Sequence, residues 1–375
     1  MIYLDYSANT PVDTRVLERF CAVERRCIGN ANSHHQAGSA AKAEIDAATI
    51  KIASLLGVQP AEIIYTSGAS EANNFALKGL ARLSRHAGRH IISTPLEHSS
   101  VSGTLTTLQE QGYEIDLLDV KQDGTVDLEH LKDLLRPDTI CVAITLVDSE
   151  LGVVQPVQEI AAILKAYPHC HLHVDATQAV GKIPVSFEGV DTMSLTAHKF
   201  YGLNGIGLLI KRRNLALEPL IHGGESTTIY RSGTPTVALA SSLACALNLA
   251  VTDLPERVGH VAKLNAELRA ALSTYPLVRI NSPDHAIPHV LNLSVQNVKG
   301  TVFQRELDAK GVCVSVKSAC SSDGLPSRAV FAVSRDRRNA LSSWRISLSH
   351  LTTEEEIKAF LQAFDVCYRE LTAVH

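Results

Sequence analysis

Residues 194–210 read SLTAHKFYGLNGIGLLI and place Lys199 between two short apolar segments. His198 precedes this lysine, and an aromatic side chain and a glycine-containing turn follow it. A lysine in a strand-to-strand connection is most often a solvated ammonium group. A lysine in a partly dry pocket beside other cations loses its proton readily and then acts as an amine nucleophile. The surrounding sequence decides the fold that holds this lysine.

From about residue 40 to residue 210, helical and strand patterns alternate. Apolar residues between 45 and 56 recur at helical spacing, and Gly57 ends that pattern. Short apolar runs, typical of strands, lie at residues 63–65, 91–92, 115–118, 140–145 and 172–174. Helical patterns separate them, one starting near Ser70 and one through 101–108. This alternation predicts an α/β fold with a mostly parallel sheet covered by helices on both faces.

After about residue 253 the pattern changes to that of a smaller α+β domain. Helical patterns mix with an isolated strand pattern, at residues 256–273, 289–295 and 302–310. Thr353 and Glu356 have the spacing of a capping box at the start of the last helix. A chain of 375 residues exceeds the size of one compact core, so we expect two domains.

Composition and charge exclude several classes of function. Hydrophobic residues make up 45%, charged residues 20%, and the net charge is −4, so we expect no direct binding of nucleic acid. No run approaches the ~18 uninterrupted apolar residues of a membrane helix, and the N-terminus lacks a signal-peptide pattern. Eight cysteines occur without a CxxC pair. We therefore expect a cytoplasmic protein with reduced thiols, no membrane contact and no metal site.

Three groups of polar residues follow predicted strands, where ligands of parallel α/β sheets gather. The first, residues 66–71, runs from a strand into a helix. Its small residues let a phosphate approach the free N–H groups of the first helical turn, and Ser70 adds a hydroxyl group. An ordinary helix cap has the same appearance.

The other two groups contain an acid and the lysine. Asp175 follows an apolar strand, with Gln178 three residues later, so it either caps a helix or faces a protonated ring nitrogen. Thr196 and His198 are placed to reach a phosphate while Lys199 meets an aldehyde. A phosphate cradle, a ring-nitrogen acid and an amine along one edge match what pyridoxal 5'-phosphate requires.

The motifs GASE, LEHSS, HVDATQAVGK, AHKFYGLNGIG, RSGT and SAC occur in this order. In that order they resemble the cysteine desulfurases of the NifS/IscS group, which are class V, fold-type I pyridoxal-phosphate enzymes. The resemblance covers nearly the whole chain. It implies a large domain with a mostly parallel seven-stranded sheet between helices, formed by residues 13–253. It also implies a smaller α+β domain, formed by residues 1–12 and 254–375, that carries the catalytic cysteine loop.

The resemblance also implies roles for individual residues. Lys199 becomes the Schiff-base lysine, Asp175 holds the pyridinium proton, and Gln178 bonds the ring hydroxyl. His98 stacks on the ring and serves as an acid or base. The residues implied to contact the phosphate are Ala69, Ser70, Thr196, His198 and, across a homodimer interface, Thr234. The residues implied to bind the substrate carboxylate are Arg345 and Ser149, which stands in place of the usual asparagine.

The nucleophile implied by the resemblance is Cys320. The segment 317–324, KSACSSDG, is small and polar, so its thiol can be exposed and reactive if its pKa is lowered. Without the resemblance, an unreactive surface cysteine is the simpler interpretation. Two departures from the family pattern stand out. Lys317 replaces a common glycine, and Asp148, Ser149 and Glu150 replace Asn-Asn-Glu.

We therefore predict a cysteine desulfurase that converts L-cysteine to L-alanine and carries sulfur as a persulfide on Cys320 to an acceptor protein. Alternatives on the same cofactor are a selenocysteine lyase and a class V aminotransferase. A catalytically weakened scaffold of a thiolation complex is the alternative outside catalysis. Iron–sulfur assembly, tRNA thiolation and DNA phosphorothioation all remain open as the destination of the sulfur.

Overall fold

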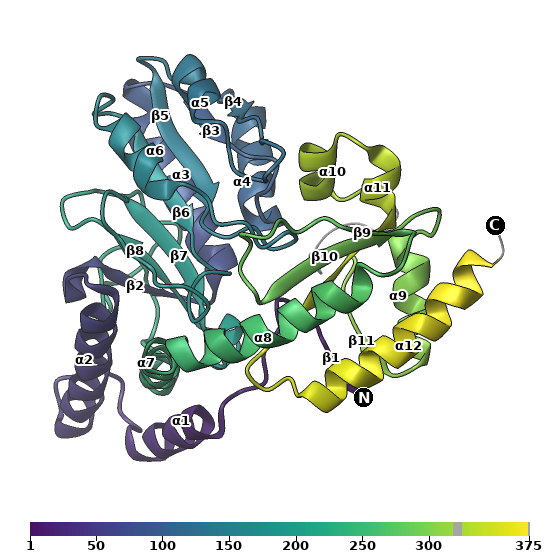
Figure 1. Ribbon diagram of the computed structural model, residues 1–375. Coiled ribbons are helices and arrows are strands. Elements are labelled where there is room, and N and C mark those ends of the chain that lie inside the picture. The colour runs from purple at the N-terminus through teal and green to yellow at the C-terminus, as the bar shows by residue number, and fades with distance from the viewer. Residues whose placement is uncertain (318–324, 374–375) are drawn as a thin grey trace.

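The computed structural model describes residues 1–317 and 325–373, and its largest element is a seven-stranded sheet (Figure 1). The strands lie in the order β2-β8-β7-β6-β5-β3-β4. Strand β8 is antiparallel to both neighbours, and the other pairs are parallel. The strands are β2 (Ile63–Thr66), β3 (His90–Ser93), β4 (Glu114–Leu117), β5 (Thr139–Thr145), β6 (His171–Asp175), β7 (Thr192–Thr196) and β8 (Gly207–Lys211). The predicted α/β fold with a mostly parallel sheet is confirmed.

Helices cover both faces of this sheet because its strands are apolar on both faces. In β5, Val142 and Ile144 join one hydrophobic core, whereas Cys141 and Ala143 join the other. This alternation follows from the two-residue period of a strand. The helices of this region are α1 (Thr14–Arg26), α2 (Gln36–Leu56), α3 (Ala69–Leu83), α4 (Ser99–Glu110), α5 (Leu128–Leu134), α6 (Val157–Leu164) and α7 (Val237–Thr252).

A smaller group of elements packs around its own core. An antiparallel sheet has the order β12-β10-β9, and β1 pairs in parallel with β11. The rings of Phe303 and Trp344 stack with centroids 5.2 Å apart in this core. The elements are β1 (Ile2–Tyr3), α8 (Leu254–Leu272), β9 (Val278–Ile280), β10 (Val290–Val295), α9 (Gly300–Ala309), β11 (Val312–Cys313), α10 (Arg328–Ser334), α11 (Arg337–Ser342), β12 (Ser343–Ser347) and α12 (Glu354–Thr372).

The chain passes between the two groups at Asp253, where α7 and α8 meet at 64°. We propose the domain boundaries expected from the sequence, because the core of the smaller group draws on Leu4 and residues 261–367, whereas the main core beside the large sheet draws on residues 16–250, with Ile287 and Val290 added from the smaller group. Among the described residues, no single helix is long and apolar enough to cross a membrane. Only the bent pair α7 and α8 reaches that length and composition together.

Candidate active site

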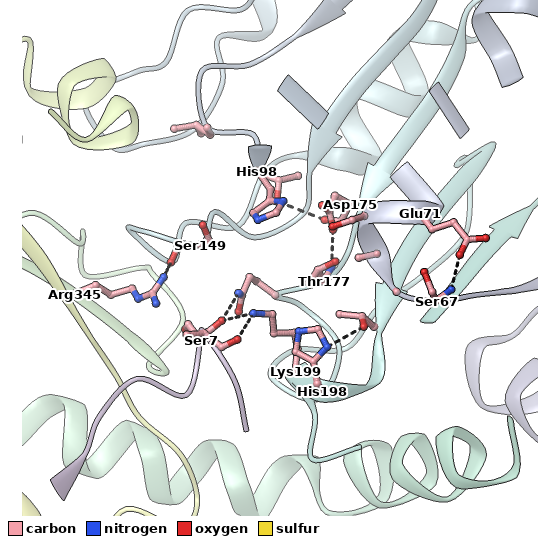
Figure 2. A pocket seen from close by; sticks show the side chains of 18 residues that line it. Ser7, Ser67, Glu71, His98, Ser149, Asp175, Thr177, His198, Lys199 and Arg345 are labelled. Atoms are coloured by element: carbon pink, nitrogen blue, oxygen red, sulfur yellow. Dashed lines mark hydrogen bonds between the residues drawn. The ribbon is translucent and has the colours of Figure 1, made fainter. Parts of the chain in front are cut away.

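A cavity of about 340 Å³ opens where β6 and β7 end and α3 begins (Figure 2). Most of the side chains predicted from the sequence line it: Ala69, Ser70, His98, Ser149, Asp175, Gln178, Thr196, His198, Lys199 and Arg345. Thr234 is exposed and lies outside the set of lining residues. Cys320 lies outside the described residues. Ten of the twelve site residues predicted from the sequence therefore lie together in this cavity.

Lys199 projects into the cavity from the short 3-10 helix η3 (Ala197–Lys199), which directly follows β7. Its Nζ donates to the carbonyl oxygens of Ser7 and Ala8, at 2.7 and 2.6 Å. Figure 2 shows Lys199 and Ser7 facing each other. Tyr201 then turns the chain with φ of 67°, a conformation that is uncommon for a residue other than glycine. The peptide carbonyls thus bind a lysine whose side chain is only partly exposed.

Asp175 ends β6 and is buried, and both carboxyl oxygens accept hydrogen bonds. Asn73 Nδ2 donates to Oδ2 at 2.8 Å, and the Thr177 backbone N–H donates to Oδ1 at 2.9 Å. Neither bond needs a proton on the carboxyl group, so the geometry suits an ionised acid. A buried carboxylate in a cavity is suited to hold a cationic ring nitrogen.

The opposite end of the cavity is suited to bind a phosphate. Gly68 occupies the N-cap of α3 with φ of 156° and provides no side chain to cap the helix. A Cβ at Gly207 would approach the Gly68 Cα to 2.7 Å, so two glycines are needed where the strands meet this turn. Thr196 Oγ1 lies 3.1 Å from His198 Nδ1. Burial, and then the charges of nearby lysines, lower the pKa of His198 to about 4, so this imidazole is neutral.

A carboxylate at the same helix end is matched by a cation. Glu71 lies in the first turn of α3, and Arg231 Nε donates to its Oε1 at 3.0 Å. Burial raises the pKa of Glu71, but bonds from Arg231 and the Ser67 backbone N–H outweigh this effect and hold the pKa below its usual value. Arg231 therefore offsets a negative charge that would otherwise repel a phosphate.

His98 forms the N-cap of α4 beside the cavity. Its Nδ1 accepts the backbone N–H of Ser100 at 3.1 Å. Burial lowers the pKa of His98, which favours the neutral imidazole. The ring lines the same cavity as Asp175 and Lys199.

Arg345 lies on β12 with 1% of its surface exposed. Its Nη2 donates to Asp5 Oδ1 at 2.9 Å. Its Nη1 donates to the Ser149 carbonyl at 2.8 Å (Figure 2). Among the described residues, its Nε has no hydrogen-bond partner. A buried guanidinium group with a spare donor, held by two partners at the cavity wall, is suited to bind a carboxylate.

A buried acidic group lies behind this wall. Asp148 Oδ2 accepts the backbone N–H groups of Glu150 and Leu151, while its Oδ1 has no partner among the described residues. Burial, and then the charge of Glu150, raise the pKa of Asp148 to about 7. Burial likewise raises the pKa of Glu150, against the opposing effects of Ser327, Arg345 and Lys317.

The residues that hold the predicted ones in place were not predicted from the sequence. Ser7 and Ala8 bind Lys199, Asp5 holds Arg345, and Asn73 holds Asp175. Polar residues in the segment 5–8, DYSA, were the available signal for the first three. Asn73 lies among apolar residues on the buried face of α3, and this position was its only signal.

Comparison with known proteins places this site in a family. The model of the class-V aminotransferases matches residues 2–360. The chain belongs to that family. Its relatives include the cysteine desulfurase IscS of Proteus mirabilis, which is 40% identical over 95% of this chain and 90% of its own length.

Solved structures agree with this assignment. A NifS-like protein superposes with a TM-score of 0.91 at 36% identity, covering 97% of this chain and 98% of its own. SspA in complex with cysteine superposes with a TM-score of 0.83 at 30% identity, covering 94% of this chain and 100% of its own. The resemblance to the NifS/IscS cysteine desulfurases, stated from the motifs, is confirmed.

Proposed function

We propose that this chain is a pyridoxal-phosphate-dependent cysteine desulfurase that converts L-cysteine to L-alanine and transfers the sulfur to an acceptor protein. The observation that supports it most directly is the cavity that holds Lys199, Asp175 and Arg345 together. The amine of Lys199 suits an aldehyde, and Asp175, which accepts two hydrogen bonds, suits a ring nitrogen. The buried guanidinium group of Arg345 suits a substrate carboxylate. The relatives named cysteine desulfurase select this reaction among those of class V.

The residues present fit the cofactor. The uncapped N-terminus of α3 and the hydroxyl groups of Ser70 and Thr196 suit its phosphate. Asp175 suits its ring nitrogen, and Gln178 suits its ring hydroxyl. When bound, pyridoxal phosphate supplies an electron sink for the negative charge that develops at the substrate Cα.

Side chains of this protein orient the substrate and transfer its protons. Arg345 orients the substrate carboxylate, and Lys199, once released from the carbonyls of Ser7 and Ala8, takes the proton from Cα as a general base. The neutral His98 can exchange a proton at the same face of the cavity.

Sulfur transfer is assigned to Cys320 through the family motif. The Cys320 thiolate attacks the substrate sulfur, and a sulfur–sulfur bond forms while the carbon–sulfur bond of the substrate breaks. The electron pair of the broken bond stays with the carbon, which takes up a proton and leaves as alanine. The persulfide on Cys320 then passes its outer sulfur to the acceptor protein.

A homodimer with shared sites is part of this proposal. Thr234 is exposed and lies outside its own cavity, whereas Arg231, three residues earlier, bonds Glu71 at the cavity. The segment 231–234 therefore extends from one site toward the surface, where a second subunit can receive Thr234. We also propose the cytoplasmic location expected from the sequence.

The test is product analysis combined with replacement of the thiol. Protein loaded with pyridoxal phosphate and given L-cysteine should release alanine and, with a thiol reductant, sulfide in equal amounts. Cys320→Ser should retain the absorbance of bound cofactor yet release almost no sulfide. Cys313→Ser is the matched control, since Cys313 lies in β11, and it should retain activity. Mass spectrometry should find the added sulfur on Cys320. Full turnover by Cys320→Ser would contradict the proposal and favour an aminotransferase.

A further inference from the structure

The side chain of Asn73 uses all of its hydrogen-bonding capacity inside the protein. Its Nδ2 donates to Asp175 Oδ2 at 2.8 Å and to Ser100 Oγ at 2.9 Å. Its Oδ1 accepts from the Ser194 hydroxyl and lies 3.0 Å from His173 Nε2. Asn73 is 0% exposed. An amide has two donor hydrogens and two acceptor lone pairs, so no position remains for water.

The orientation of this amide follows from its neighbours. An ionised carboxylate only accepts hydrogen bonds, so the NH₂ group of Asn73 must face Asp175. Its carbonyl oxygen then faces His173 Nε2, which must carry a proton. Burial lowers the pKa of His173 to about 4, so this ring is neutral and its Nδ1, 2.9 Å from Thr192 Oγ1, is the acceptor.

The same amide determines the hydrogen bonding at Ser100. Ser100 Oγ accepts from Asn73, which leaves the single hydroxyl proton for His98 Nδ1, 2.9 Å away. The backbone N–H of Ser100 also donates to this Nδ1, at 3.1 Å. A backbone N–H cannot accept, so Nδ1 must be the unprotonated nitrogen. The proton of the neutral imidazole is therefore on Nε2.

Burial and the nearby charges both affect the pKa of His98. Burial is the largest effect on its pKa and lowers it. The charge of Asp175 raises the pKa, whereas those of Lys199 and Arg328 lower it. His98 also caps α4, and the positive end of a helix dipole disfavours a second proton on the ring.

We propose that Asn73 and Ser100 are positioning residues that hold His98 in its Nε2-protonated tautomer through one chain of hydrogen bonds anchored on Asp175. The inference rests on the proposed function, in which His98 exchanges a proton with the substrate. Only Nε2 is then available for that exchange. Asn73 thereby couples the acid that faces the ring nitrogen to the imidazole that faces the substrate.

The test measures the tautomer of His98 directly and then changes it by substitution. In protein with ¹⁵N-labelled histidine, comparison with His98→Gln assigns the His98 resonances, and Nδ1 should be the unprotonated nitrogen. Ser100→Ala removes the hydroxyl donor to Nδ1, which disfavours the neutral ring and should move the His98 titration to higher pH. Loss of one hydrogen bond should lower kcat by about tenfold. Asn73→Ala frees the Ser100 hydroxyl to rotate away from Nδ1 and should move the His98 titration in the same direction.

Two further variants separate positioning from folding. Ser99→Ala makes the same change one residue earlier, at a position outside the described cavity lining, and should leave both the titration and kcat unchanged. Ser100→Thr keeps the hydroxyl group and should restore the wild-type titration. A protonated Nδ1 in the wild-type protein would overturn the proposal even if no variant folds. So would a Ser100→Ala protein that titrates and turns over like the wild type. Absence of sulfide from the wild type would instead overturn the proposed function, because the tautomer is measured without turnover.

Discussion

Replacement of Asp148 by asparagine should stabilise the protein more at pH 8 than at pH 5. Burial, and then the charge of Glu150, raise the pKa of the Asp148 carboxyl to about 7. A carboxyl group with a higher pKa in the folded state than in the unfolded state stabilises the fold at low pH. This contribution is lost as the pH rises toward the folded pKa. The folded protein thus keeps this proton up to about pH 7, while the unfolded chain releases it near pH 4.

The magnitude follows from these two values. As the pH rises from 5 to 7, the free energy of unfolding of the wild type falls by about 1.4 kcal/mol for each pH unit. The loss over this range sums to about 3 kcal/mol. Asparagine carries no titrating group, and its Oδ1 can still accept the N–H groups that bind Asp148 Oδ2. The stabilisation of the asparagine variant relative to the wild type should therefore be larger at pH 8 than at pH 5 by about 3 kcal/mol. The charge of Asp148 also contributes to the raised pKa of Glu97. The asparagine variant removes this repulsion, which stabilises the fold further.

Urea unfolding at several pH values between 5 and 8 measures this difference. The single tryptophan, Trp344, is buried and serves as a fluorescence probe alongside circular dichroism. Asp133→Asn is the matched control, because Asp133 is exposed on α5. It should leave the free energy of unfolding nearly unchanged. A wild-type protein and an Asp148→Asn variant with the same pH dependence would refute the assignment of the titration to Asp148.

Three further predictions concern the site itself. Lys199→Ala should abolish the visible absorbance of the bound cofactor and the turnover of cysteine, and a covalent cofactor adduct at another lysine would refute its role. Arg345→Lys should raise KM for cysteine about 10- to 100-fold, because a charged hydrogen bond of about 1.5–3 kcal/mol is lost, while cofactor absorbance persists; an unchanged KM would contradict carboxylate binding by Arg345. Mixing Lys199→Ala with Thr234→Ala subunits should restore activity, since in the proposed homodimer both lesions fall in one composite site and the other site is wild type; an active monomer would remove this expectation.

The regular part of the fold was predictable because its signals are local. Strands such as β5 (Thr139–Thr145) are continuous apolar runs, and the predicted strand at 140–145 differs from it by one residue. The capping box at Thr353 and Glu356 was also predicted, and both of its hydrogen bonds are present at the start of α12. Such patterns depend on neighbours in sequence, so they can be read without knowing the tertiary structure.

The supporting contacts of the site were not predictable for the opposite reason. Asn73 bonds Asp175 across 102 positions, and Asp5 bonds Arg345 across 340. No periodicity specifies which distant polar group meets a buried amide. Residues of the cavity wall were predicted where they belong to family motifs, whereas their supports required the tertiary structure.

The pairing of β1 with β11 has a consequence for the synthesis of the protein. Ile2 is opposite Val312, and Asp5 and Ser7 contact Arg345 and Ser347. The carbonyls that bind Lys199 therefore belong to a segment held by residues that leave the ribosome more than 300 positions later. The sheet of residues 63–211 can form earlier, during translation, because its contacts lie within the part already made. The cavity wall is completed only near the end of translation, so a nascent chain cannot hold Lys199 as the finished protein does.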